Sequence, residues 1–142
     1  MVPVVVNVVD YATGGAAIRR IRDQVFVIEQ GVPSKLEHDD QDPGAVHVLA
    51  FAGDVPVGTG RITPDGKIGR MAVLASHRGT GVGRMILAEL VTAAERSAMT
   101  QVYCFAQCQA MRFYERLGFT AEGPVFMEAG LEHQRMFRHL SP

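Results

Sequence analysis

A glycine-rich turn in front of a helix is the part of this sequence best suited to bind a phosphate. Residues 77–84 read HRGTGVGR and join an apolar run over 68–74 to a helical run that reaches about residue 98. The first turn of a helix leaves its N–H groups unpartnered, and the helix dipole adds partial positive charge there. Glycine lets a ligand approach because no Cβ stands in the way. With Arg78 and Arg84 flanking it, the turn is a predicted site for phosphate or pyrophosphate.

Two familiar phosphate-binding motifs do not fit this turn. A nucleoside-triphosphate P-loop ends in Gly-Lys-Ser/Thr, whereas Gly83 is followed by Arg84 and Met85. A dinucleotide fingerprint requires a second βαβ half, and none follows here. The turn therefore predicts a different class of phosphate-bearing ligand.

The composition predicts one folded domain over residues 1–142. Of the 142 residues 47% are apolar, and the formal net charge of −1 gives no support to nucleic-acid binding. The sequence contains no apolar run of about 18 residues, so no membrane span is predicted. The N-terminal residues do not resemble a signal peptide. Cys104 and Cys108 are too few to form a zinc site and suit a reducing compartment. We expect a cytoplasmic protein without a metal.

The hydrophobic pattern predicts an α+β fold, with a mixed sheet between helices on both faces. Strands are expected over 2–9, 45–52, 55–63, 67–74, 101–106, 119–127 and 134–139. Helices are expected from 13 or 14 to 30, from 82 to 98 and over 107–117. Residues 31–44 are polar and acidic, and they are predicted to form a long loop.

This order and two motifs resemble the GNAT superfamily of acyl-CoA-dependent N-acetyltransferases. Its phosphate turn, Q/R-x-x-G-x-G/A, matches residues 78–83, and its late A-x-x-F-Y-x-x-x-G-F element matches residues 110–119. A finer resemblance to the small bacterial ElaA-like group lies in residues 25–30, in the pattern Glu37-x-Asp39-x-x-Asp42, and in His47. The resemblance implies a mostly antiparallel sheet of six or seven strands, in which the fourth and fifth strands splay apart.

The resemblance implies acetyl-CoA as the co-substrate. The turn would hold the pyrophosphate and the strand before it the pantetheine arm, while a backbone N–H of Met71 or Ala72 would polarise the thioester oxygen. Gly69 is expected to mark the bulge that begins the splay. The residues implied in cofactor binding are Met71, Ala72, Val73, Arg78, Gly79, Thr80, Gly81, Val82, Gly83, Arg84, Gln107 and Phe113.

Tyr114 is the candidate general acid that protonates the departing thiolate. A phenol with a pKa of about 10 is well matched to an alkyl thiolate. The spacing alone favours a core residue, because Tyr114 shares an apolar helix face with Ala110, Phe113 and Leu117. The family match favours the catalytic interpretation.

The general base stays open among several residues. An amine must be neutral to attack, whereas lysine-like amines are mostly protonated at neutral pH. The candidate bases are Glu37, Asp39, His47 and His133, and Glu29, Gln30 and Asp42 are expected near the substrate. His47 could instead be a core histidine, and the acidic loop could be solvated. If the loop lies at the acceptor mouth, its charge would favour a cationic amine.

The predicted function is transfer of an acetyl group from acetyl-CoA to a primary amine, by direct attack in a ternary complex. The acceptor would be a small-molecule amine or an exposed amino group of a peptide. A non-catalytic acyl-CoA-binding sensor or interaction module is the alternative. No nucleic acid or membrane is expected as a partner, and the family implies a possible homodimer.

Overall fold

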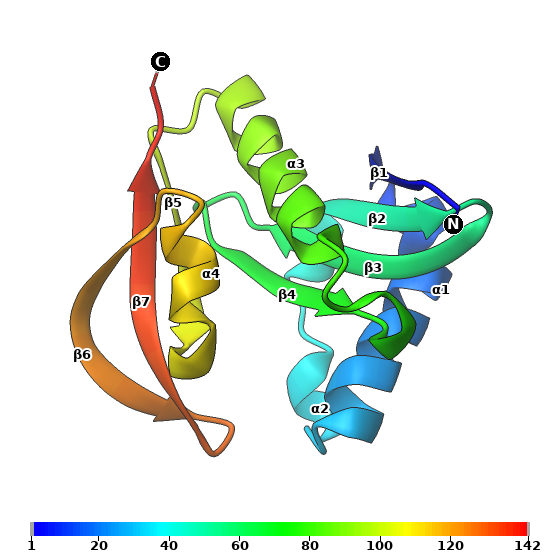
Figure 1. Cartoon of the computed structure of the whole chain (residues 1–142), viewed down its shortest axis with the longest axis horizontal. Helices are drawn as coiled ribbons and strands as arrows, with labels where there is room; N and C mark the ends of the chain where they lie inside the picture. Colours follow the sequence, from blue (N-terminus) through cyan, green and yellow to red (C-terminus); the bar gives the residue numbers. More distant parts are fainter. Residues whose placement is uncertain (1, 142) are drawn as a thin grey trace.

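The computed structural model describes residues 2–141, whose seven strands form two antiparallel sheets (Figure 1). The first sheet has the order β1-β2-β3-β4, with β1 (Val4–Val9), β2 (Val46–Ala52), β3 (Val55–Ile62) and β4 (Ile68–Val73). The second has the order β5-β7-β6, with β5 (Gln101–Gln107), β6 (Thr120–Glu128) and β7 (Leu131–His139). Neighbouring strands are antiparallel in both sheets.

Helices cover both faces of the first sheet, and a shorter helix lies beside the second (Figure 1). The helical elements are α1 (Tyr11–Arg22), the π-helix η1 (Asp23–Glu29), α2 (Ser34–Glu37), η2 (Asp42–Gly44), η3 (Ala75–His77), α3 (Val82–Arg96), η4 (Cys108–Ala110) and α4 (Met111–Glu115). Side chains alternate across a strand, so Val48 and Ala50 of β2 pack in the core cluster with α3, while Leu49 packs in the cluster with α1. Among residues 2–141, no helix is long and apolar enough to cross a membrane.

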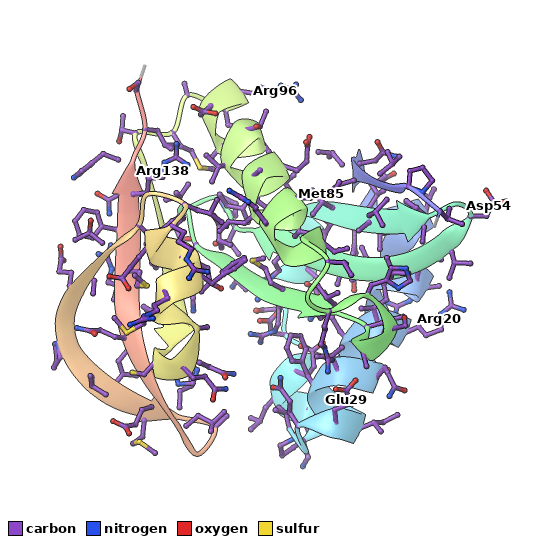
Figure 2. All side chains as sticks on the ribbon, viewed as in Figure 1. Arg20, Glu29, Asp54, Met85, Arg96 and Arg138 are labelled. Carbon is purple, nitrogen blue, oxygen red and sulfur yellow. The ribbon has the colours of Figure 1, made fainter. Side chains whose placement is uncertain are left out.

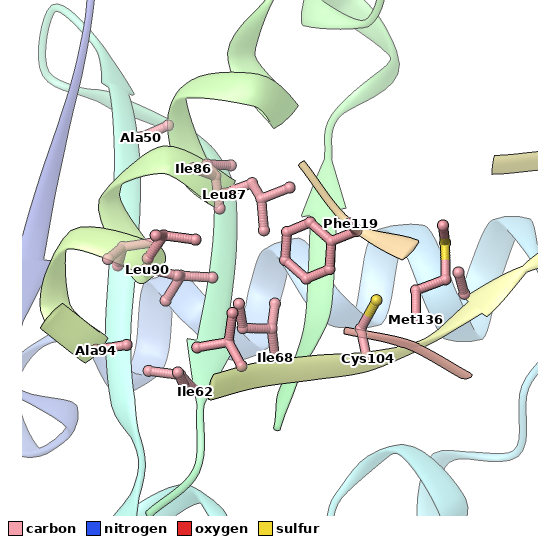
Figure 3. Packing of buried hydrophobic residues seen from close by; sticks show 14 of the residues in the cluster. Ala50, Ile62, Ile68, Ile86, Leu87, Leu90, Ala94, Cys104, Phe119 and Met136 are labelled. Atoms are coloured by element: carbon pink, nitrogen blue, oxygen red, sulfur yellow. The ribbon is translucent and has the colours of Figure 1, made fainter. Parts of the chain in front are cut away.

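Two glycines of β3 bring α3 directly onto the sheet backbone. A Cβ on Gly58 or Gly60 would lie 2.8 Å from a carbon of Ile86, which is closer than real Cβ contacts come. Figure 3 shows Ile86 and Leu90 of α3 within the main cluster, which also contains Phe119 and Met136 from the side of the second sheet. α3, with the turn at its start, therefore packs closely on β3.

The fourth and fifth strands splay apart from a single point of contact. One isolated parallel bridge joins Lys67 to Tyr103, and the Tyr103 N–H donates to the Gly66 carbonyl at 3.0 Å. Beyond this point, β4 and β5 belong to different sheets. The fold therefore leaves a gap between the two strands whose closed end is fixed by backbone hydrogen bonding.

A bulge distorts β4 inside this gap. Thr59 faces Ala72 and Arg61 faces Gly69, so two residues of β4, Arg70 and Met71, lie opposite the one intervening residue of β3. Arg70 has a φ of 48°, which is uncommon for a residue other than glycine. Such bulges bend a strand and often lie beside active sites.

The predicted α+β fold with seven strands, helices on both faces and splayed fourth and fifth strands is confirmed. Several details differ, and the strands form two antiparallel sheets rather than one mixed sheet. The first helix begins earlier, at Tyr11, because Asp10 caps it by accepting the Ala12 N–H at 3.2 Å. The expected loop 31–44 contains α2 and η2, and the expected helix over 107–117 is the short pair η4 and α4. The bulge lies at residues 70 and 71 rather than at Gly69.

Candidate active site

The turn before α3 presents a row of backbone donors. Gly79 and Gly81 have φ angles of 75° and 91°, which glycine adopts readily. The first hydrogen bond of α3 runs from the Met85 N–H to the Gly81 carbonyl, at 3.1 Å. Within residues 2–141, the N–H groups of residues 79–84 have no hydrogen-bond partner. Such a row of donors can bind the oxygens of an anion, and the sequence predicts phosphate or pyrophosphate here.

The two arginines beside this turn are placed differently. Arg78 turns toward β4, where its Nε donates to the Val73 carbonyl at 2.9 Å. Its Nη2 lies 2.8 Å from Oε2 of Glu29, a residue labelled in Figure 2 at the end of η1. Arg84 is exposed in the first turn of α3. Arg84 is thus free to face a bound phosphate, whereas Arg78 links the turn to η1.

The ring of Phe113 connects the turn to α4. A Cβ built on Gly83 would lie 3.6 Å from this ring and 4.0 Å from the Val73 side chain. These are ordinary van der Waals distances, so they show that the turn, β4 and α4 lie side by side at Gly83. The three predicted cofactor-binding segments are neighbours in space.

A cavity of about 600 Å³ occupies the gap between β4 and β5. η1 and α2 border it on one side, and the β6–β7 turn borders it on the other. Its volume lies in the range of small-molecule sites. Six of the predicted site residues line it: Gln30, Glu37, Met71, Gln107, Tyr114 and His133. Glu29, Asp39, Asp42 and His47 are not among the lining residues. Among residues 2–141, no His, Cys, Asp and Glu side chains are grouped so as to hold a metal ion.

The Tyr114 hydroxyl is open to this cavity. Its ring packs edge-to-face against Phe113 and Phe119, with centroid distances of 5.1 and 5.7 Å. Within residues 2–141 the hydroxyl has no hydrogen-bond partner, and it is not among the buried unpartnered atoms. Burial, with the adjacent Cys104 thiol, raises the pKa of Tyr114 well above its usual value. The phenol therefore keeps its proton at neutral pH.

Three of the four acidic residues in 37–42, namely Glu37, Asp39 and Asp42, are held by buried arginines, whereas Asp40 is exposed. Arg22, fully buried on α1, approaches Glu37 at 2.5 Å and Asp42 at 2.8 Å. Arg61 lies 2.7 Å from both Asp42 and Asp39. Burial alone would raise the pKa of Asp42, but hydrogen bonds from the two arginines outweigh it and lower that pKa. The hydrogen bonds from Arg61 likewise hold the pKa of Asp39 far below its usual range.

A third arginine completes this ion-pair network. Arg70, on the bulge of β4, places Nε 2.9 Å from Glu37 and Nη2 3.1 Å from Asp39. The network thus pairs three arginines with three carboxylates, and its formal charges cancel. The acidic loop over 31–44 was expected to be solvated or to offer its negative charge to a cationic amine. The structure differs at Glu37, Asp39 and Asp42, because arginines already balance the charges of these three side chains.

His47 is a buried residue of β2 outside the cavity. Its Nε2 donates to the Asp42 carbonyl at 2.8 Å, and its ring stacks on Tyr11 with a centroid distance of 4.7 Å. Nδ1 is buried without a partner among residues 2–141. Burial lowers the pKa of His47, so the imidazole is neutral at neutral pH. These contacts give His47 a packing role, as the alternative sequence interpretation anticipated.

His133, on β7, presents one ring nitrogen for chemistry. Its Nδ1 lies 2.9 Å from the Leu131 carbonyl, which can only accept, so Nδ1 carries the hydrogen. In the neutral ring, Nε2 is then a free acceptor. Oε2 of Glu128 lies 3.8 Å from Nε2, and the ring stacks on Phe126. Nε2 is therefore the ring nitrogen that is open to a substrate, with the Glu128 carboxylate on the same side.

Sequence reasoning gave no role to Arg22 or to the side chains of Arg61 and Arg70. Arg22 carried a usable signal, because it follows Ile18 by four residues and so falls on the buried face of α1. Arginine is almost never fully buried unless it is paired. An arginine on that face therefore requires carboxylates, and the acids of residues 37–42 are the nearby supply.

Comparison with known proteins gives one consistent family. The family model described as an acetyltransferase (GNAT) domain matches residues 9–140. The chain is 36% identical over 122 residues to the uncharacterized N-acetyltransferase YjcF of Bacillus subtilis, which covers 83% of this chain and 87% of the relative. An acyl-CoA N-acyltransferase from Pseudomonas aeruginosa (TM-score 0.86) and Escherichia coli ElaA (TM-score 0.84) are each 28% identical, with 96% of this chain and 99% of theirs covered.

Proposed function

Because the chain belongs to the GNAT family of acetyltransferases, we propose that it transfers an acetyl group from acetyl-CoA to a primary amine by direct attack in a ternary complex. One observation carries the proposal. An unpartnered tyrosine hydroxyl and a histidine with a free Nε2 line the same cavity, beside the bulge of β4. An acyl transfer to an amine needs a proton donor and a proton acceptor on one site.

The turn N–H groups of residues 79–84 bind the pyrophosphate of acetyl-CoA, and Arg84 adds positive charge. The Val73 carbonyl, which now accepts from Arg78, is the acceptor that the pantetheine arm would use on β4. Binding of the arm would therefore displace Arg78 from this carbonyl. Gln107 and Phe113 border the path of the arm from the β5 and α4 sides.

Next to the bulge, a backbone N–H of Met71 or Ala72 polarises the thioester carbonyl. Fixed donors aimed at developing negative charge stabilise a transition state without having to reorganise. The bulge at residues 70 and 71 supports this role, because an unpaired strand residue frees backbone groups. The amine then attacks the carbonyl carbon from the acceptor side of the cavity.

His133 is the proposed general base, acting directly or through a water molecule. Its Nε2 is the free acceptor, and Glu128 supports the imidazolium that forms. Glu37 also lines the cavity, but both of its oxygens are held by Arg22 and Arg70. A carboxylate in two ion pairs loses both if it takes a proton, so Glu37 is the weaker candidate.

Tyr114 is the proposed general acid. A phenol that keeps its proton at neutral pH can donate a hydrogen bond to the thiolate as the carbon–sulfur bond breaks. The hydroxyl needs a position open to the cavity and free of other acceptors, and Tyr114 has both.

Substitution of Tyr114 with Phe tests the proposal. We expect kcat to fall roughly 10²- to 10⁴-fold in an assay of CoA release with a panel of primary amines. The Kd for acetyl-CoA, measured by calorimetry, should change little because the turn is intact. Tyr103→Phe is the matched control, since Tyr103 lies outside the cavity and bonds to Asp65. Unchanged turnover in Tyr114→Phe would remove this residue from the mechanism. Acetyl-CoA binding by the wild type without turnover of any amine would instead favour an acyl-CoA-binding module.

A further inference from the structure

Two cationic side chains on the cavity wall have uncommitted donors. Lys67 is half-buried, and its Nζ lies 4.1 Å from the ring centroid of Phe105. Among residues 2–141, no carboxylate lies within 4 Å of this ammonium. On Arg70, Nε and Nη2 are used by the ion-pair network, whereas Nη1 has no partner within the same residues and is not buried.

The charge balance on the cavity wall distinguishes Lys67 from Arg70. The three arginines and three carboxylates of the network cancel, which leaves Lys67 and Glu128 as the remaining charged groups of opposite sign on the cavity wall. Glu128 is 53% exposed in its side chain and faces His133, on the side where an amine would lose its proton. A half-buried ammonium without a counter-ion is costly, so Lys67 is suited to an anion supplied by the ligand.

The remaining wall is apolar. Phe26, Val32 and Leu36 approach from η1 and α2, and Leu131 approaches from the β6–β7 turn. This wall suits a compact apolar body between the two charged ends. Because the charge of Arg70 is already balanced within the network, the charge of Lys67, with the Nη1 donors of Arg70 beside it, matches a single negative charge better than a phosphate dianion.

We propose that the acceptor is an amine that also carries a carboxylate, namely an amino acid with an apolar side chain. Its carboxylate is bound by Lys67 and by Nη1 of Arg70, its apolar side chain lies against the wall near Leu36, and its amino group points toward His133. This inference rests on the proposed acetyl transfer and adds the class of acceptor to it.

The inference is tested with three acceptors that differ at the carboxylate. Leucine is compared with isopentylamine, which lacks the carboxylate, and with leucinamide, in which it is neutral. We expect the wild type to have a kcat/KM at least about tenfold higher for leucine than for either partner, since hydrogen bonds to charged groups are among the stronger ones. Leucinamide controls for amine basicity, because its amino group is less basic than that of leucine.

Substitution of Lys67 then assigns the preference to this residue. In Lys67→Met, the ratio of kcat/KM for leucine over isopentylamine should fall about tenfold, while Lys67→Arg should retain it. Because the same two amines are compared in each variant, their difference in basicity cancels. Lys35→Met is the matched control: Lys35 is the only other lysine of the chain, and it is exposed on α2 outside the cavity.

The failures of the two proposals are distinguishable. Acetylation of isopentylamine at least as fast as leucine in the wild type overturns the acceptor class and leaves acetyl transfer standing. A leucine preference that survives intact in Lys67→Met also overturns it. Absence of CoA release with leucine, while other amines of the panel are acetylated, overturns the acceptor class alone, whereas absence of CoA release with every amine, under conditions where acetyl-CoA binds, overturns both proposals.

Discussion

Arg22 is the residue whose loss should destabilise the protein most clearly. It is fully buried at the end of α1, and its guanidinium joins this helix to Glu37 on α2 and to Asp42 on η2. Substitution of Arg22 with Met keeps a long apolar stem but removes the charge. Two buried carboxylates then each lose a partner, although Arg61 still holds Asp42 and Arg70 still holds Glu37.

The expected magnitude follows from the burial and from these remaining partners. Removing one member of a buried ion pair costs about 3–5 kcal/mol, and the two surviving arginines place Arg22→Met near the lower end, at about 3 kcal/mol. With an unfolding entropy of about 2.1 cal/mol/K per residue, 142 residues give about 0.3 kcal/mol/K. The melting temperature should therefore fall by about 10 °C.

Thermal and urea denaturation followed by circular dichroism measure this loss. Arg20→Met is the matched control, because Arg20 is exposed on the same helix and forms no ion pair among residues 2–141 (Figure 2). We expect the control to stay within about 0.5 kcal/mol of the wild type. Adding only Glu37→Gln to Arg22→Met should recover part of the loss, since two arginines (Arg61 and Arg70) then face two carboxylates (Asp39 and Asp42) and the formal charges cancel again. A loss in Arg22→Met no larger than in Arg20→Met would refute the reasoning.

Two further outcomes follow from the site. Replacing His133 with Gln should lower kcat about 10²-fold. Added imidazole should restore part of the lost activity, because an external base can then accept the proton. If imidazole leaves the activity of the variant unchanged, His133 is a structural residue. Acid should unfold the protein through Asp39 and Asp42, whose pKa values the arginines lower in the folded state. Their contribution to the free energy of unfolding is complete above the unfolded pKa of about 3.9 and is lost as pH falls toward the folded values. Melting temperatures should therefore decline below about pH 4, and less steeply in Arg61→Met; parallel declines in the two proteins would contradict this account.

Local features of the sequence were enough to predict most of the fold. The glycines at 79 and 81 identified the turn, because only a local backbone property is needed there. The apolar runs over 45–52 and 55–63 were predicted as two strands, and the structure has β2 and β3 there, because a short apolar run is a local signal of a buried strand. Two motifs placed these elements in a family, which the family model confirms. The catalytic and cofactor-binding roles of the predicted residues stay proposals.

The tertiary structure alone decided how the charged residues are used. Arg22 pairs with Glu37 and Asp42 across 15 and 20 residues of sequence, and Arg70 reaches back 31 residues to Asp39. No periodicity encodes such partners, because each pair depends on where separate elements pack. The same holds for the cavity, whose wall combines Tyr114, His133 and Lys67 from three elements or loops. Sequence by itself determined the elements and the phosphate turn through local backbone and hydrophobic preferences. Which acids are neutralised, and which cation is left without a counter-ion on the cavity wall, was decided by long-range packing.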